Sequence, residues 1–167
     1  MCPACEAEAR GEVFDYDAVL RGIDGMIERS GQAIQFVSGT STTPDWAYTI
    51  GRQRRGLPDL IVMGLDPRSS AELLNEADAR GDELMALLAT GTLEDAIDYT
   101  FVPVPERIWH TTDYLLGAAN DARLLVPERR LEAMQLVWAS DDGRFPWDPD
   151  ADPNFQSMQV ILGLLRS

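Results

Sequence analysis

Five short runs rich in apolar and β-branched residues constrain the fold of this chain more than any other feature. They are residues 33–37, 46–50, 59–63, 99–104 and 133–138. Glycine, proline, serine or aspartate interrupts the chain between these runs, as expected for strands separated by turns. Helical segments do not alternate regularly with the strands, which argues against a doubly wound parallel sheet. The pattern therefore predicts an α+β fold, a single domain with a mainly antiparallel sheet and helices packed on it.

Three helices are predicted at residues 15–30, 67–90 and 106–119. In the first, Val19, Leu20, Ile23, Met26 and Ile27 form one apolar face at helical spacing. Asp15 precedes this helix, and Asp66 followed by Pro67 is a typical start for the second. Residues 159–165 form an apolar tail that should pack back onto the body of the domain.

Length and composition indicate one domain. The chain has 167 residues, of which we expect 1–12 to be a flexible segment and 13–167 a single globular domain. Its net charge of −14 argues against nucleic acid or an anionic membrane as a partner, because both require clustered lysine and arginine. The N-terminus lacks the basic start and apolar core of a signal peptide, and the longest apolar runs are too short to span a bilayer. We therefore expect a cytoplasmic protein.

Cys2 and Cys5 form a Cys-x-x-Cys pair, whose spacing suits a metal or redox site. A zinc ion needs four ligands, and the chain offers only one histidine, His110, besides its carboxylates. Two chains meeting at their N-termini could supply four thiolates, so a zinc-linked homodimer is one hypothesis. A redox pair would need a strand–helix–strand context that is missing here. Two reduced thiols without a ligand remain the preferred interpretation.

Arg52, Arg54 and Arg55 concentrate positive charge between Gly51 and Gly56. Guanidinium groups bind phosphate or carboxylate through paired hydrogen bonds, so this loop is a candidate site for an anionic ligand. It is not a phosphate-binding loop, because no Lys-Ser or Lys-Thr follows the second glycine. The alternative, which we favour, is that these arginines pair with acids of the chain itself.

Aromatic residues offer a second candidate site. Trp46, Tyr48, Trp138 and Trp147, with Phe145, could line a pocket for a planar ligand, although core packing explains them equally well. The amides of Gln135 and Gln156 are flanked by apolar residues and need hydrogen-bond partners, either backbone or ligand. The segment Asp141-Asp142-Gly143 is typical of a turn.

Three blocks of the chain, residues 46–51, 56–65 and 135–147, resemble a bacterial family, domain of unknown function 4262. The resemblance covers most of residues 14–159, and some members also begin with Cys-x-x-Cys. Two departures stand out. The chain has Ser30-Gly31-Gln32 where the family commonly has His-Gly-Trp, and Arg52 where an aliphatic residue is usual. The resemblance implies no activity.

These observations lead to two functional hypotheses. The first is a non-catalytic module that binds a small anionic or aromatic molecule or a protein partner. It draws on the arginine loop and the aromatic residues, and on the absence of a nucleophile motif. The second is an enzyme that uses Asp141 and Asp142 together with Gln135 or His110. In that case Asp113, three residues after His110, could orient the imidazole.

Overall fold

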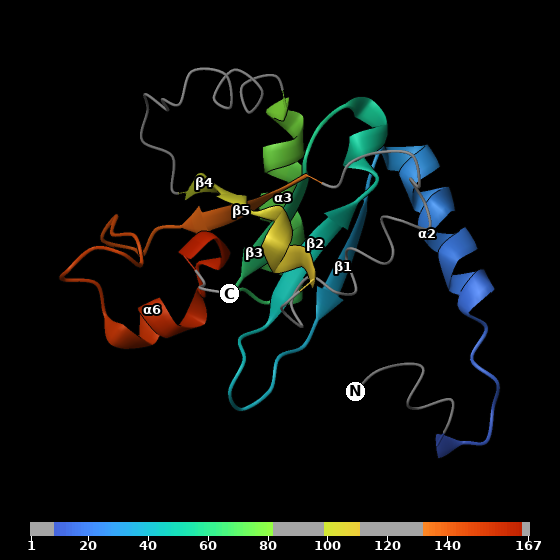
Figure 1. Cartoon of the computed structure of the whole chain (residues 1–167), viewed down its shortest axis with the longest axis horizontal. Helices are drawn as coiled ribbons and strands as arrows, with labels where there is room; N and C mark the ends of the chain where they lie inside the picture. The colour runs from blue at the N-terminus through green and yellow to red at the C-terminus, as the bar shows by residue number, and fades with distance from the viewer. Residues whose placement is uncertain (1–8, 82–98, 111–131, 165–167) are drawn as a thin grey trace.

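The computed structural model describes residues 9–81, 99–110 and 132–164, and these form one α+β domain (Figure 1). Five strands make a single sheet in the order β1-β2-β3-β5-β4. The strands are β1 (Ala33–Val37), β2 (Trp46–Ile50), β3 (Asp59–Met63), β4 (Tyr99–Val104) and β5 (Ala133–Trp138). Every neighbouring pair is antiparallel except β3 and β5, which run parallel. The predicted fold class is confirmed, and the five strand ranges agree with the sequence pattern.

Side chains alternate between the two faces of the sheet, and each face carries its own apolar core. On one face, Tyr48 and Ile61 meet Ile23 and Ile27 from helix α2 (Tyr16–Ser30). On the other face, Leu60 and Leu136 are among the strand residues that pack against Leu74 and Ala77 of helix α3 (Pro67–Ala79). We call these clusters the α2 core and the α3 core after the helices that cover them. The sheet separates the two cores, so side chains on its opposite faces do not line the same pocket.

The predicted starts of α2 and α3 are confirmed. The Asp15 carboxylate accepts a hydrogen bond from the backbone of Ala18 at 2.8 Å, and Asp66 caps α3 in the same way. Gly31 ends α2 in the left-handed region, with φ at 80°. The buried positions of α2 are Ile23 and Ile27, towards its C-terminal end, whereas Val19 in its first half is 39% exposed.

Two predicted helices differ from the structure. Helix α3 ends at Ala79, where the sequence predicted a helix over 67–90. Residues Glu106–His110 form a 3₁₀ helix, η2, where the sequence predicted the start of an α-helix over 106–119. The Ile108 N–H donates to Pro105 O at 2.9 Å, three residues back, and this tighter winding accompanies full burial of Ile108 in the α2 core. Residues 111–119 and 82–90, the remainder of the predicted helices, lie outside the described residues. Within the described ranges, no helix is both long and apolar enough to cross a bilayer.

The C-terminal segment packs back onto the domain, as its apolar pattern predicted. It contains a short helix, α6 (Pro153–Met158), and a 3₁₀ turn, η3 (Leu162–Leu164). Leu162 is fully buried in the α2 core. Helix α6 was not predicted, although Asp152 caps it and Pro153 opens it, which is the signal that identified the start of α3.

Candidate functional site

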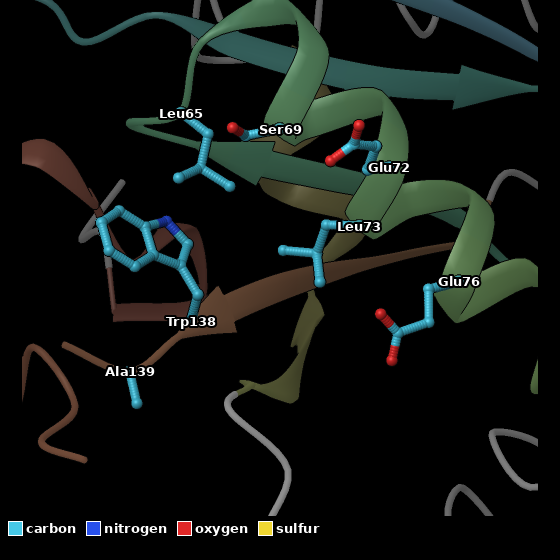
Figure 2. A pocket seen from close by; sticks show the side chains of 7 residues that line it. All are labelled: Leu65, Ser69, Glu72, Leu73, Glu76, Trp138 and Ala139. Carbon is cyan, nitrogen blue, oxygen red and sulfur yellow. The ribbon is translucent and has the colours of Figure 1, made fainter. Parts of the chain in front are cut away.

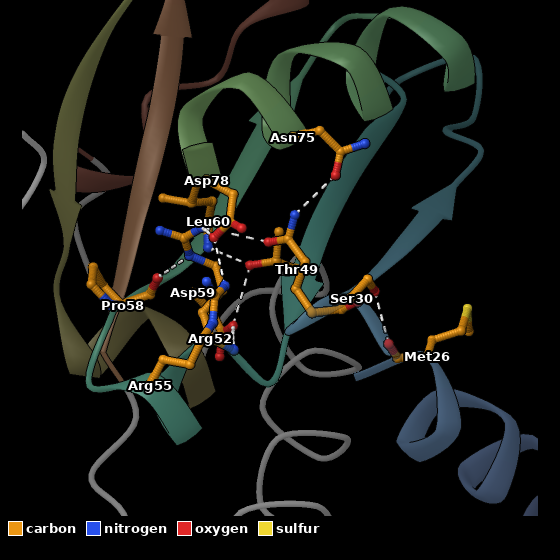
Figure 3. Close-up of polar contacts among 11 residues, drawn as sticks. Met26, Ser30, Thr49, Arg52, Arg55, Pro58, Asp59, Leu60, Asn75 and Asp78 are labelled. Atoms are coloured by element: carbon orange, nitrogen blue, oxygen red, sulfur yellow. Dashed lines mark hydrogen bonds and ion pairs between the residues drawn. The ribbon is translucent and has the colours of Figure 1, made fainter. Parts of the chain in front are cut away.

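The arginine loop forms a 3₁₀ turn, η1 (Arg52–Arg55), between two glycines in the left-handed region. Arg52 is completely buried, while Arg54 and Arg55 are exposed. The Arg52 Nε donates to the carbonyl of Pro58 at 2.8 Å, and its Nη1 forms an ion pair with Asp78 of α3 (Figure 3).

The other two arginines also contact acids of the chain. Arg55 Nη2 lies 2.6 Å from the Asp78 carboxylate, and Arg54 Nη2 lies 2.5 Å from that of Asp24 in α2. Thus each of the three guanidinium groups has a carboxylate partner within the protein. This arrangement fits a structural role, in which the loop ties α2 and α3 to the sheet.

A buried carboxylate that the sequence analysis missed lies beside this loop. Asp59 begins β3 and accepts hydrogen bonds from the Thr49 hydroxyl and the Arg52 N–H, both at 3.2 Å, and from the Gln53 amide at 3.1 Å. Burial raises the pKa of Asp59 to about 7, although these donors and the Arg52 charge oppose the shift. Burial also lowers the pKa of Arg52. An acidic residue opening a wholly buried strand was the available signal for this cluster.

The predicted aromatic pocket does not form as a unit. Trp46 and Tyr48 belong to the α2 core, whereas Trp138 packs against the α3 core on the opposite face. Trp147 lies in the turn after β5, 46% exposed, with its ring stacked on Phe145 at a centroid distance of 5.0 Å. Of these aromatic residues, Trp138 alone lines the groove described below.

The side chain of Gln135 also has a structural role. It is wholly buried, and its amide bonds the backbone of the C-terminal segment, donating to Val160 O at 2.8 Å and accepting from Leu162 N at 2.7 Å. Gln159 reciprocates from that segment: its amide accepts from Trp138 N at 3.0 Å and donates to Trp138 O at 2.9 Å. Two glutamine amides therefore fasten the C-terminal segment to β5. Neither a ligand nor a catalytic role is needed to satisfy Gln135.

The candidate carboxylates Asp141 and Asp142 do not share the buried surroundings of Gln135. Asp141 and Asp142 are exposed in a turn, where a hydrogen bond from the Ser140 hydroxyl lowers the pKa of Asp142. His110 ends η2, and its side chain lies outside the described part of the structure. Cys2, Cys5 and Asp113 lie outside the described residues. Over the described ranges, no cluster of three or more histidine, cysteine or acidic side chains could hold a metal ion.

A groove of about 310 Å³ opens between α3 and the end of β5 (Figure 2). Its lining divides into an apolar part and a polar part. Leu65, Leu73, Trp138 and Ala139 form the apolar part, while Ser69, Glu72 and Glu76 lie along α3 and form the polar part. The α3 residues of this lining are spaced three and four apart, which places them on one side of the helix. Among these lining residues, only Trp138 was predicted as a site residue from the sequence.

Several contacts hold the Trp138 indole in place at the groove. Its Nε1 donates to Met63 O at 2.8 Å, and the Phe155 ring of α6 meets it edge to face at 5.0 Å. Helix α6 packs closely against Gly64, which follows β3: a Cβ added at Gly64 would lie only 2.6 Å from Met158 O. These contacts fix the Trp138 side chain, and the hydrogen bonds with the Gln159 amide fix its backbone.

The chain matches one family model, although searches of curated proteins and of solved structures found no match. The family model described as a domain of unknown function, DUF4262, matches residues 26–152, which include β1 to β5, α3 and the arginine loop. This match spans most of the chain and agrees with the resemblance of its sequence blocks, so the protein belongs to the DUF4262 family.

Proposed function

We propose that this domain is a non-catalytic module that binds a small molecule with an apolar, aromatic body in the groove between α3 and the end of β5. The observation that carries this proposal is the groove of about 310 Å³ with an indole and two leucines in its lining. Small-molecule sites are concave and mainly apolar, and they begin at about 300 Å³. The volume of the groove lies at the lower end of this range and part of its lining is apolar, which supports a small ligand.

The fixed position of Trp138 supports a binding role. A side chain already held by hydrogen bonds and ring packing loses little conformational freedom when a ligand arrives. Aromatic rings also contribute about 0.5–1.5 kcal/mol per stacked or edge-to-face pair beyond the area that they bury. An aromatic ligand would therefore gain most from this wall of the groove.

The charges of the groove favour an aromatic ligand over an anionic one. Arg52, Arg54 and Arg55 contact Asp78 and Asp24, and none of them lines the groove. The charged residues in the described lining are glutamates. An anion would meet like charge there.

Methyl NMR of the full chain tests the proposal, with the neutral molecule indole as the probe. We expect the Leu65 and Leu73 methyl signals to shift together and to saturate as indole is added. Ala139→Phe should abolish the shifts by filling the groove. Val19→Phe, which adds the same ring at a partly exposed site on α2, should leave them unchanged.

Two outcomes would refute the proposal. In one, neither indole nor a larger neutral aromatic such as 1-naphthol shifts the two leucine signals. In the other, indole binds Ala139→Phe as well as it binds the original chain. The amide spectrum of each variant shows whether it retains the fold.

A further inference from the structure

The charge of the groove narrows the class of ligand, and this step rests on the proposed function. We infer that the groove selects a small organic cation, a protonated amine on an apolar body, and that Glu76 is the residue that selects it. In the described lining the two ionisable side chains are Glu72 and Glu76, and no lysine or arginine accompanies them. A positive group in the groove would therefore meet only negative charge there.

The two glutamates are positioned by helical geometry. They stand four residues apart on α3, so their side chains lie one turn apart on the same side of the helix. Like charges at this spacing repel each other and destabilise a helix. A bound cation would relieve that repulsion, so helix α3 itself gains from its presence.

The partners of the polar side chains single out Glu76. Glu72 Oε1 accepts from Arg68 Nε at 2.8 Å, and the Ser69 hydroxyl donates to Asp66 at 2.6 Å. The Glu76 carboxylate has no hydrogen bond or ion pair within the part of the chain that the structure describes. Arg80, four residues further along the chain, lies outside the lining and donates from Nη1 to the Tyr99 hydroxyl at 3.4 Å. Glu76 is therefore the carboxylate in the described lining that is left to pair with a ligand.

The layout of the groove fits a ligand with two distinct ends. Figure 2 shows Trp138 and Glu76 on opposite sides of the hollow, with Leu73 between them. An apolar body against Trp138 and Leu73 would place an amine on a short linker towards Glu76. Neutral or anionic molecules of the same shape would gain the apolar contacts alone.

Three probes that share one indole body test this inference: tryptamine is a cation, 3-ethylindole is neutral, and indole-3-propionate is an anion. Dissociation constants are measured from the Leu65 and Leu73 methyl shifts at low ionic strength. A single charge pair about 4 Å apart in water gives about 1 kcal/mol, so we expect tryptamine to bind about fivefold more tightly than 3-ethylindole. Indole-3-propionate should bind more weakly than both. In 1 M salt the difference should fall, because screening then acts over about 3 Å.

The net charge of −14 attracts any cation, so variants are needed to separate this general attraction from selection by the groove. Glu76→Gln should remove most of the preference for tryptamine, and Glu72→Gln should remove less because Arg68 already offsets that charge. Glu28→Gln is the matched control, since it changes the net charge equally at an exposed site on α2. Glu28→Gln should therefore keep the preference for tryptamine that the original chain shows.

The possible outcomes test cation selectivity separately from the binding of an aromatic ligand in the groove. Equal binding of the three probes, or equal loss of preference in Glu28→Gln and Glu76→Gln, overturns the cation selectivity and leaves the groove as an aromatic site. Failure of every probe to shift the two leucine signals overturns both.

Discussion

The buried amide of Gln135 gives the sharpest test of how this fold is held together. We predict that Gln135→Met, which keeps the length of the side chain but removes its polar atoms, destabilises the protein and loosens its C-terminal segment. In the native structure the amide satisfies Val160 O and Leu162 N, at 2.8 Å and 2.7 Å, at a site with no exposed surface. Methionine has no donor for Val160 O, and its thioether is only a weak acceptor for the Leu162 N–H.

The magnitude follows from the two backbone groups left behind. A buried polar group that loses its partner costs about 1–3 kcal/mol, and a new apolar side chain recovers part of that loss. We therefore expect a decrease of about 2–4 kcal/mol in the free energy of unfolding. If the segment detaches instead, the cost is similar, because exposing the buried Leu162 side chain costs about 1.5–3 kcal/mol.

Urea unfolding measures the change, and Gln156→Met provides its control. Gln156 is exposed, and its amide makes only a long contact of 3.4 Å to Asp148 O, so its replacement should change stability by less than about 0.5 kcal/mol. Hydrogen exchange at the Leu162 amide should accelerate in Gln135→Met and not in Gln156→Met. A loss below about 1 kcal/mol for Gln135→Met, or equal losses in the two variants, would refute this account of the amide.

Three further predictions concern the arginine loop and its buried acid. Because burial raises the pKa of Asp59 to about 7, the folded state binds a proton that the unfolded state releases near pH 4. Stability should therefore fall by up to about 4 kcal/mol as the pH rises from 4 to 7, and Asp59→Asn should flatten that slope in urea unfolding at pH 5 and pH 8; an unchanged slope would contradict the assignment. Gly51→Ala should cost more in thermal unfolding than Gly56→Ala: both have positive φ, but only at Gly51 would a Cβ meet the α2 core, at 2.7 Å. Equal losses would show that the α2 contact is unimportant. Arg52→Met should lose about 1–3 kcal/mol in chemical unfolding, because it removes the buried donor to Pro58 O and one of the two arginines that pair with Asp78. Arg54→Gln breaks a more exposed pair and should lose at most about 1 kcal/mol; a larger loss for Arg54→Gln than for Arg52→Met would contradict the burial argument.

The strands could be predicted from sequence because their signals are local. Glycine, proline and serine bound the apolar runs, and the Asp66-Pro67 pair defines the start of α3 without reference to any distant residue. The type of η2 could not be predicted in this way. Its tight winding accompanies the burial of Ile108 in a core to which several elements contribute.

The candidate site could not be assembled from sequence because it depends on the strand order. Trp46 and Trp138 both looked like pocket residues, and only their placement on opposite faces of the sheet separates them. Likewise, the spacing of Glu72 and Glu76 predicts a shared helix face, but not that this face meets the end of β5. The burial of Arg52 depends on Asp78, 26 residues away.

The parallel pairing of β3 with β5 has a consequence for synthesis on the ribosome. Strand β3 ends at Met63 and its partner begins at Ala133, so about 70 residues must be translated before the centre of the sheet can close. At roughly 5–20 residues per second, that interval lasts about 4–14 s. Throughout it, the nascent β1-β2-β3 meander presents one edge of an apolar strand, Leu60–Val62, with no partner to cover it. Such an edge pairs readily with other chains, so the yield of folded protein depends on how well this interval is protected from neighbouring nascent copies.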